Sequence, residues 1–126
     1  MIVIDASVLA VVLGDDGEDG DRARARVQGE DLAAPELIDL EVASVWRRTL
    51  RDERRAALAL VDLAELPLSR APHLPLLARC WELRHKLTPY DAAYVALAEA
   101  LEVELLTADQ RMARASGIRC AVATLT

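Results

Sequence analysis

The N-terminal segment Ile2-Val3-Ile4-Asp5-Ala6-Ser7-Val8-Leu9 runs from three β-branched residues into an aspartate and then into an apolar helical pattern. The β-branched run predicts a short buried strand at residues 2–4, and residues 6–13 predict a helix. Asp5 is therefore expected to close the strand and precede the helix. A strand followed at once by a helix is typical of sheets whose strands run parallel.

The same alternation of short apolar strands and helices continues along the chain. We expect further strands at residues 32–34, 68–69, 104–106 and 118–122, and further helices at residues 21–28, 37–51, 53–66, 74–86, 89–101 and 110–115. Pro35 suits the first turn of the helix after it, and the acidic segment 14–21 is expected to be a loop. The pattern predicts an α/β fold, a three-layer α/β/α sandwich with a mainly parallel central sheet.

Length and composition indicate one globular domain over residues 1–126, since 53% of the residues are hydrophobic and 29% are charged. No apolar run approaches the roughly 20 residues needed to cross a bilayer. Asp5 also interrupts the stretch where a signal peptide would carry its apolar core. We therefore expect a soluble, cytoplasmic protein with no membrane partner.

The net charge of −6 argues against broad, sequence-independent binding of nucleic acid, which needs a basic surface. The arginines are nevertheless clustered, and one group could supply a local basic track: Arg47, Arg48, Arg51, Arg54 and Arg55. The alternative is a solvated helix face, because acidic residues are interleaved with these arginines.

Four acids stand at positions where they could meet at one edge of the sheet. Asp5 and Asp109 each follow an expected strand, and the carboxyl ends of parallel strands share one edge. Asp91 lies near the start of a helix, and Glu41 sits beside the apolar stripe of another. Carboxylates that converge repel one another unless a cation lies between them, and Mg²⁺ and Mn²⁺ prefer carboxylate oxygens. The sequence therefore predicts a divalent-metal site.

Each acid also has a purely structural interpretation. Asp5 and Asp109 could cap the helices that follow them. Asp91 lies three residues after Thr88, which resembles a capping box. Glu41 could form a salt bridge with Arg47 or Arg48. From the residues alone, these interpretations stay open beside the metal site.

Four segments together resemble the PIN-domain family, and within it the VapC-type toxins of VapBC toxin–antitoxin pairs. They are Val3-Ile4-Asp5-Ala6-Ser7-Val8-Leu9, Pro35-Glu36-Leu37-Ile38-Asp39-Leu40-Glu41-Val42, Leu87-Thr88-Pro89-Tyr90-Asp91-Ala92-Ala93-Tyr94-Val95-Ala96-Leu97-Ala98 and Leu105-Leu106-Thr107-Ala108-Asp109. The third segment is the most specific. The resemblance covers nearly the whole chain and implies a PIN-like fold.

The resemblance implies a metal-dependent endoribonuclease, the toxin of a type II toxin–antitoxin system, that cleaves RNA phosphodiester bonds with metal-activated water. Mg²⁺ or Mn²⁺ would be held by the four acids, and Thr107 and Ser7 match hydroxyl positions that would orient an acid, a water or a phosphate. The four acids are Asp5, Glu41, Asp91 and Asp109. A homodimer and a cognate VapB-type antitoxin, whose C-terminal segment lies in a groove, are also implied.

The alternative is a non-catalytic PIN-like module that only binds another protein and keeps its acids as helix caps. Trp46, Trp81, Leu83 and Leu87 could then line a partner groove, although core packing is the expected role of most of them. The two interpretations differ in whether divalent ions bind.

Overall fold

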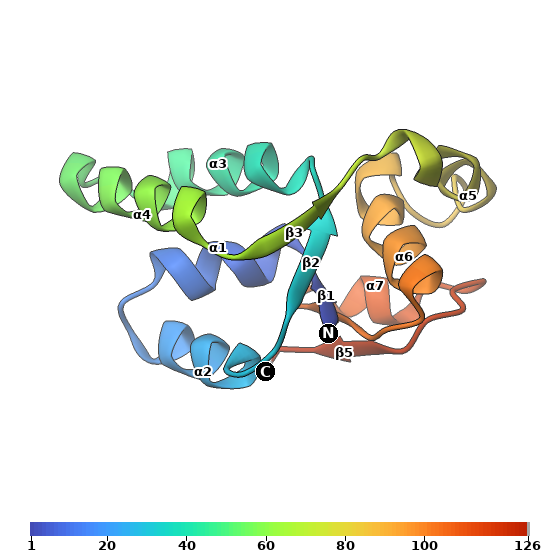
Figure 1. Ribbon diagram of the computed structural model, residues 1–126, viewed down its shortest axis with the longest axis horizontal. Coiled ribbons are helices and arrows are strands. Elements are labelled where there is room, and N and C mark those ends of the chain that lie inside the picture. The colour runs from blue at the N-terminus through green and yellow to red at the C-terminus, as the bar shows by residue number, and fades with distance from the viewer. Residues whose placement is uncertain (126) are drawn as a thin grey trace.

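The computed structural model describes residues 1–125. Over these residues five strands form one sheet in which every pair of neighbours is parallel, in the order β3-β2-β1-β4-β5. The strands are β1 (Ile2–Ile4), β2 (Leu32–Pro35), β3 (Leu68–Ala71), β4 (Leu105–Thr107) and β5 (Val122–Thr124). Figure 1 shows them crossing the middle of the molecule, with the helices on either side. The expected parallel sheet is confirmed.

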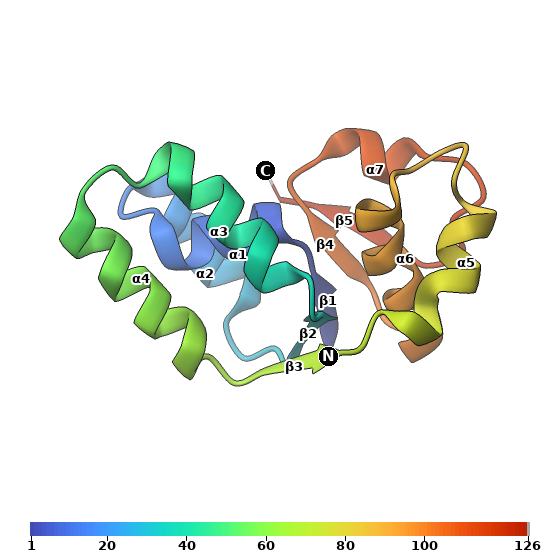
Figure 2. The same cartoon turned by 90° about the horizontal axis from the view of Figure 1, so that it is seen from above.

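The helices lie in two groups, one on each face of the sheet. They are α1 (Ala6–Gly14), α2 (Glu18–Val27), α3 (Ile38–Thr49), α4 (Glu53–Glu65), a 3₁₀ turn η1 (Leu74–Leu76), α5 (Leu77–Glu82), α6 (Pro89–Leu101) and α7 (Gln110–Arg114). Figure 2 shows α1 to α4 on one side of the strands and α5 to α7 on the other. The three-layer arrangement follows from the sequence because helices must cover both faces of a parallel sheet. No helix within the described residues is both long and apolar enough to span a membrane.

The order of the strands reverses at β1. The chain builds β1, β2 and β3 in one direction and then returns past β1 to build β4 and β5. Val3 pairs with Leu105 and Ile4 with Leu106, so the carboxyl ends of β1 and β4 lie side by side. In open α/β sheets ligands bind outside such ends, where the strand order reverses.

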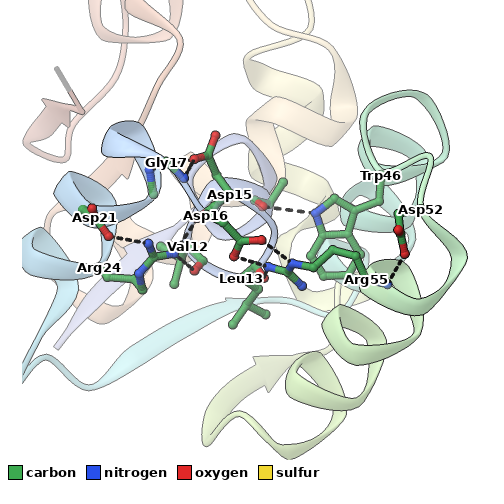
Figure 3. A network of polar contacts seen from close by, with 12 residues as sticks. Val12, Leu13, Asp15, Asp16, Gly17, Asp21, Arg24, Trp46, Asp52 and Arg55 are labelled. Atoms are coloured by element: carbon green, nitrogen blue, oxygen red, sulfur yellow. Dashed lines mark hydrogen bonds and ion pairs between the residues drawn. The ribbon is translucent and has the colours of Figure 1, made fainter.

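The core explains why the strands are continuous apolar runs. Val3 and Ile4 are fully buried, as are Leu105 and Leu106 on the neighbouring strand. Trp46 of α3 is also buried, and its indole Nε1 donates to the carbonyl of Ala10 in α1 at 3.1 Å (Figure 3). Trp46 is therefore a core residue and not part of a partner groove, and the same holds for the buried Leu83.

Two expectations near the N-terminal half were wrong. The helix expected at 21–28 begins at Glu18, because the Asp15 carboxylate accepts the backbone N–H groups of Gly17 and Gly20 at 2.7 and 3.2 Å and so organises the first turn (Figure 3). Pro35 lies at the end of β2, opposite Ala71 of β3, and not in the first turn of α3. A proline fits there because the bond to β3 at this point is made by the Glu36 N–H, which donates to the Ala71 carbonyl at 2.8 Å, so the pairing does not need an N–H at residue 35.

Two expectations in the C-terminal half were also wrong. The helix expected over 74–86 is a 3₁₀ turn followed by a short α5, and the chain turns after Glu82 to bury Leu83. The last strand is at Val122–Thr124 instead of 118–122. The Arg119 N–H donates to the Glu99 carboxylate at 2.7 Å, which holds the preceding segment against α6 and keeps it out of the sheet.

Candidate active site

Asp5 is buried at the junction of β1 and α1, with 4% of its surface exposed. Its Oδ1 accepts the Ser7 hydroxyl at 2.5 Å and the Val8 N–H at 3.1 Å, and its Oδ2 accepts the Thr107 hydroxyl. The bond from Val8 confirms that Asp5 caps α1. A helix cap needs only the bond from the backbone N–H. The two hydroxyl donors therefore fix the orientation of this carboxylate beyond what capping requires.

Both hydroxyls are themselves oriented by the turn that follows β4. The Ala108 N–H donates to Ser7 Oγ, and the Asp109 N–H donates to Thr107 Oγ1, each at 3.0 Å. A hydroxyl that accepts a backbone N–H on one side directs its own proton to another acceptor, which here is Asp5. The network joins the turn after β1 to the turn after β4 across the reversal in strand order. Burial raises the pKa of Asp5 above its ordinary value, against the opposing effect of these bonds.

Glu41 lies in α3 and is held by a tyrosine from the opposite face of the sheet. The Tyr94 hydroxyl, on α6, donates to Glu41 Oε1 at 2.6 Å, and Tyr94 is almost fully buried. Burial raises the pKa of Glu41, and the negative charges of Asp91 and Asp5 raise it further. The salt bridge to Arg47 or Arg48 was a wrong expectation, because neither arginine forms an ion pair within residues 1–125.

Asp91 lies in the first turn of α6, where the capping role belongs to a neighbour. Thr88 Oγ1 accepts the Asp91 N–H at 3.2 Å and is the cap of this helix, as its sequence position predicts. Burial raises the pKa of the Asp91 carboxyl, and the negative charges of Asp5 and Asp109 add to the effect. The pKa of Asp91 is therefore raised both by its burial and by two neighbouring acids.

Asp109 differs from the other three acids because its charge is already balanced. It caps α7 by accepting the Arg111 N–H at 2.9 Å, and the Arg111 guanidinium donates to both of its oxygens at 3.2 Å. These bonds to Arg111 lower the pKa of Asp109. Of the four acids, then, two are helix caps, Asp5 and Asp109, while Glu41 and Asp91 cap nothing.

All four acids line one cavity of about 410 Å³ at the carboxyl edge of the sheet. Its other polar lining comes from Ser7, Ser44, Arg48, Tyr90 and Tyr94, whereas Thr107 is fully buried behind Asp5. Within residues 1–125 no three Asp, Glu, His or Cys side chains already stand at the spacing needed to hold one ion. The structure therefore gathers the predicted acids around one cavity without bringing them to ligand distance.

The donor set of this cavity fits a hard divalent cation. Its acids offer only carboxylate oxygens, the ligands that Mg²⁺ and Mn²⁺ prefer. Full burial raises the pKa of Asp5, and partial burial raises the pKa values of Glu41 and Asp91, on which neighbouring negative charges also act. A bound dication would offset both the loss of hydration of these carboxylates and the repulsion between them.

The contribution of Tyr94 was missed by the sequence analysis. The available signal is a tyrosine within the apolar pattern of α6, one turn after Asp91. A tyrosine buried in a core needs a partner for its hydroxyl. Which partner it finds could not be read from the sequence, because Glu41 is 53 positions away along the chain.

Comparison with known proteins shows to which family the chain is related. The family model described as "PIN domain" matches residues 2–118. The chain is 40% identical to "VapC ribonuclease Mb0985" of Mycobacterium bovis, over 97% of this chain and 96% of that protein. It is also 40% identical to "Ribonuclease VapC1" of Mycobacterium tuberculosis, over 95% of this chain and 94% of that protein.

A solved structure has the same fold over almost the same length. It is described as a "Toxin-antitoxin complex from Klebsiella pneumoniae", with a TM-score of 0.70 and 22% identity over 100% of this chain and 98% of that chain. At that identity the similarity concerns the fold alone. With the family match and the relatives at 40% identity, it follows that the chain belongs to the PIN domain family and, within it, to the VapC group.

Proposed function

We propose that this protein is an endoribonuclease, the toxin of a type II toxin–antitoxin system, and that it uses Mg²⁺ or Mn²⁺ to hydrolyse RNA. The observation that carries the proposal is the cavity in which acids from four separate segments converge. The relatives named as VapC ribonucleases support it. We further propose that residues 1–126 form a single domain that acts in the cytoplasm as a homodimer and pairs with a VapB-type antitoxin.

The side chains in the cavity and directly behind it divide into groups that bind and groups that orient. Asp5, Glu41 and Asp91 would hold the ion, with Asp109 at the edge of the site because Arg111 already engages it. When bound, the ion supplies positive charge against the phosphate oxygens and makes water a better nucleophile at neutral pH.

The orienting groups keep two of these carboxylates in fixed positions. Ser7 and Thr107 direct their protons at the two oxygens of Asp5, and Tyr94 directs its proton at Glu41. Burial raises the pKa of the Tyr94 hydroxyl above its ordinary value, so the hydroxyl is protonated and acts as a donor at neutral pH. Held carboxylates lose less freedom when they bind an ion or a substrate, which is the general advantage of a preorganised site.

The alternative of a non-catalytic binding module accounts for only part of the site. It explains Asp5 and Asp109, which cap α1 and α7. It does not explain why Glu41 is partly buried beside two other acids. Burying a charged carboxylate costs free energy, and a helix that only contributes to the fold gains nothing from placing one there.

Purified protein incubated with RNA tests the proposal. We expect cleavage in the presence of Mn²⁺, its loss on addition of a chelator, and its loss in the variant Asp5→Asn. The change leaves the shape of the side chain nearly unchanged while removing its charge. Cleavage by Asp5→Asn at the wild-type rate, in a preparation free of contaminating nuclease, would contradict the assignment.

A further inference from the structure

One face of α3 lines the cavity from Glu41 to an arginine two turns further along the helix. Glu41, Ser44, Val45 and Arg48 all line the cavity. Their spacing of three, four and seven residues places them in one stripe along the helix. With a rise of about 1.5 Å per residue, Arg48 lies about 10 Å along the axis from Glu41.

Arg48 is free to meet a ligand. It is exposed, and within residues 1–125 it forms neither an ion pair nor a hydrogen bond. Among the described residues that line the cavity it is the one cation, facing four carboxylates. A side chain whose role was to neutralise those acids would be expected to contact one of them.

Another arginine of the same sequence cluster has a different role. The Arg55 guanidinium donates to the Asp16 carboxylate at 2.8 and 3.1 Å and to the carbonyl of Leu13 at 2.8 Å (Figure 3). It therefore ties the start of α4 to the end of α1 and is not available to a ligand. The structure thus divides the arginine cluster, and it singles out Arg48 as the member that reaches the cavity.

The direction of α3 fixes where Arg48 lies relative to the acids. Figure 2 shows α3 leading away from the strand ends on the side opposite α6 and α7. Helix α6 carries Asp91, and α7 begins directly after Asp109. A phosphate near the four acids would therefore have Arg48 beyond it, along the line of α3. The exposed ring of Tyr90 lines the same cavity, and exposed aromatic rings of this kind stack on the bases of single-stranded RNA.

We propose that Arg48 binds a backbone phosphate of single-stranded RNA next to the phosphate that lies at the acids. This inference rests on the proposed ribonuclease function. A guanidinium can donate two parallel hydrogen bonds to one phosphate. In a chain with a net charge of −6, one free cation at the cavity offsets repulsion that the substrate would otherwise meet from the four acids.

The test compares Arg48→Ala with Arg47→Ala, the adjacent arginine of the same helix, which is exposed but does not line the cavity. Binding of a fluorescently labelled single-stranded RNA is measured by anisotropy in a chelator, which prevents cleavage, at several KCl concentrations. We expect Arg48→Ala to weaken binding about 10-fold, the effect of losing a charge-assisted hydrogen bond. The slope of log K against log salt should fall by about 0.7.

For Arg47→Ala we expect a change of about 2-fold or less, since it loses charge without losing a contact. Both variants should keep the wild-type melting temperature, because neither arginine has a partner within the described residues. Equal losses in the two variants, or wild-type binding by Arg48→Ala, would overturn the inference. Wild-type protein that neither binds nor cleaves RNA would overturn the proposed function as well, whereas cleaving wild-type protein with an unaffected Arg48→Ala would overturn this inference alone.

Discussion

Asp5 illustrates how much one residue type at one position can reveal. Its place after a β-branched run predicts both a helix cap and a site at the sheet edge, and the structure confirms the cap. The hydroxyl of Thr107 reaches it from 102 positions away, and this contact depends on β1 and β4 being neighbours. The sequence predicts such strand ends but not which of them are adjacent, so the contact itself could not be derived from residue patterns.

The pKa of Asp5 leads to a prediction about pH. Because burial raises the folded-state pKa above the unfolded value, folding favours the protonated form, and the stability it contributes is lost as the pH rises through the raised pKa. In a chelator, we therefore expect the stability of Asp5→Asn relative to wild type to increase as the pH rises from 4 towards 7. Urea unfolding at several pH values measures this, and a pH-independent difference would contradict it.

Tyr94 permits a test of positioning apart from folding. The change Tyr94→Phe removes only the hydroxyl that donates to Glu41, so we expect Mn²⁺ to bind several-fold more weakly while unfolding becomes easier by about 1 kcal/mol. Mn²⁺ titration followed by thermal shift measures the first effect. Tyr90→Phe is the matched control on the same helix, because Tyr90 is exposed. Equal Mn²⁺ affinity in Tyr94→Phe and wild type would show that the hydrogen bond from Tyr94 does not help Glu41 to bind the ion.

Helices with local signals could be predicted, whereas segments fixed by distant contacts could not. Thr88 and Pro89 mark the start of α6, and the structure places the helix there, since capping involves residues close in sequence. The strand expected at 118–122 was wrong because Glu99 and Arg79 hold that segment. Sequence periodicity carries no information about such ion pairs.

This explanation of the misplaced strand can be tested. Arg79 donates to the Glu99 carboxylate at 2.7 and 3.1 Å and to the carbonyl of Gly117 at 2.7 Å. We expect Arg79→Met to speed hydrogen exchange of the Arg119 amide, which donates to the same carboxylate, while the amides of β1 keep their protection. Arg84→Met, which removes an exposed guanidinium stacked on Trp81, should leave both unchanged. Unaltered exchange at Arg119 in Arg79→Met would contradict the explanation.

Across the whole molecule, the sheet order turns four scattered acids into neighbours. The class of fold follows from the alternation of strands and helices, and the carboxyl edge follows from the parallel strands. The cavity itself depends on β4 lying beside β1 and on α3 and α6 facing each other across the strand ends, as Figure 2 shows. The net charge argues against a basic surface, but the folded chain places one arginine, Arg48, at the cavity. The sequence alone does not show which arginine of the cluster lies there.

Calorimetric titration of Mn²⁺ into the metal-free protein tests most directly whether the three carboxylates assigned to the ion act together. If Asp5, Glu41 and Asp91 act as one site, wild-type protein binds Mn²⁺ with measurable heat, and Asp5→Asn binds it at least about 10-fold more weakly, as expected for the loss of one charged ligand. Arg47→Ala serves as a folded control with wild-type affinity. Wild-type protein that takes up no Mn²⁺, or Asp5→Asn that binds it as tightly as wild type, would contradict the account.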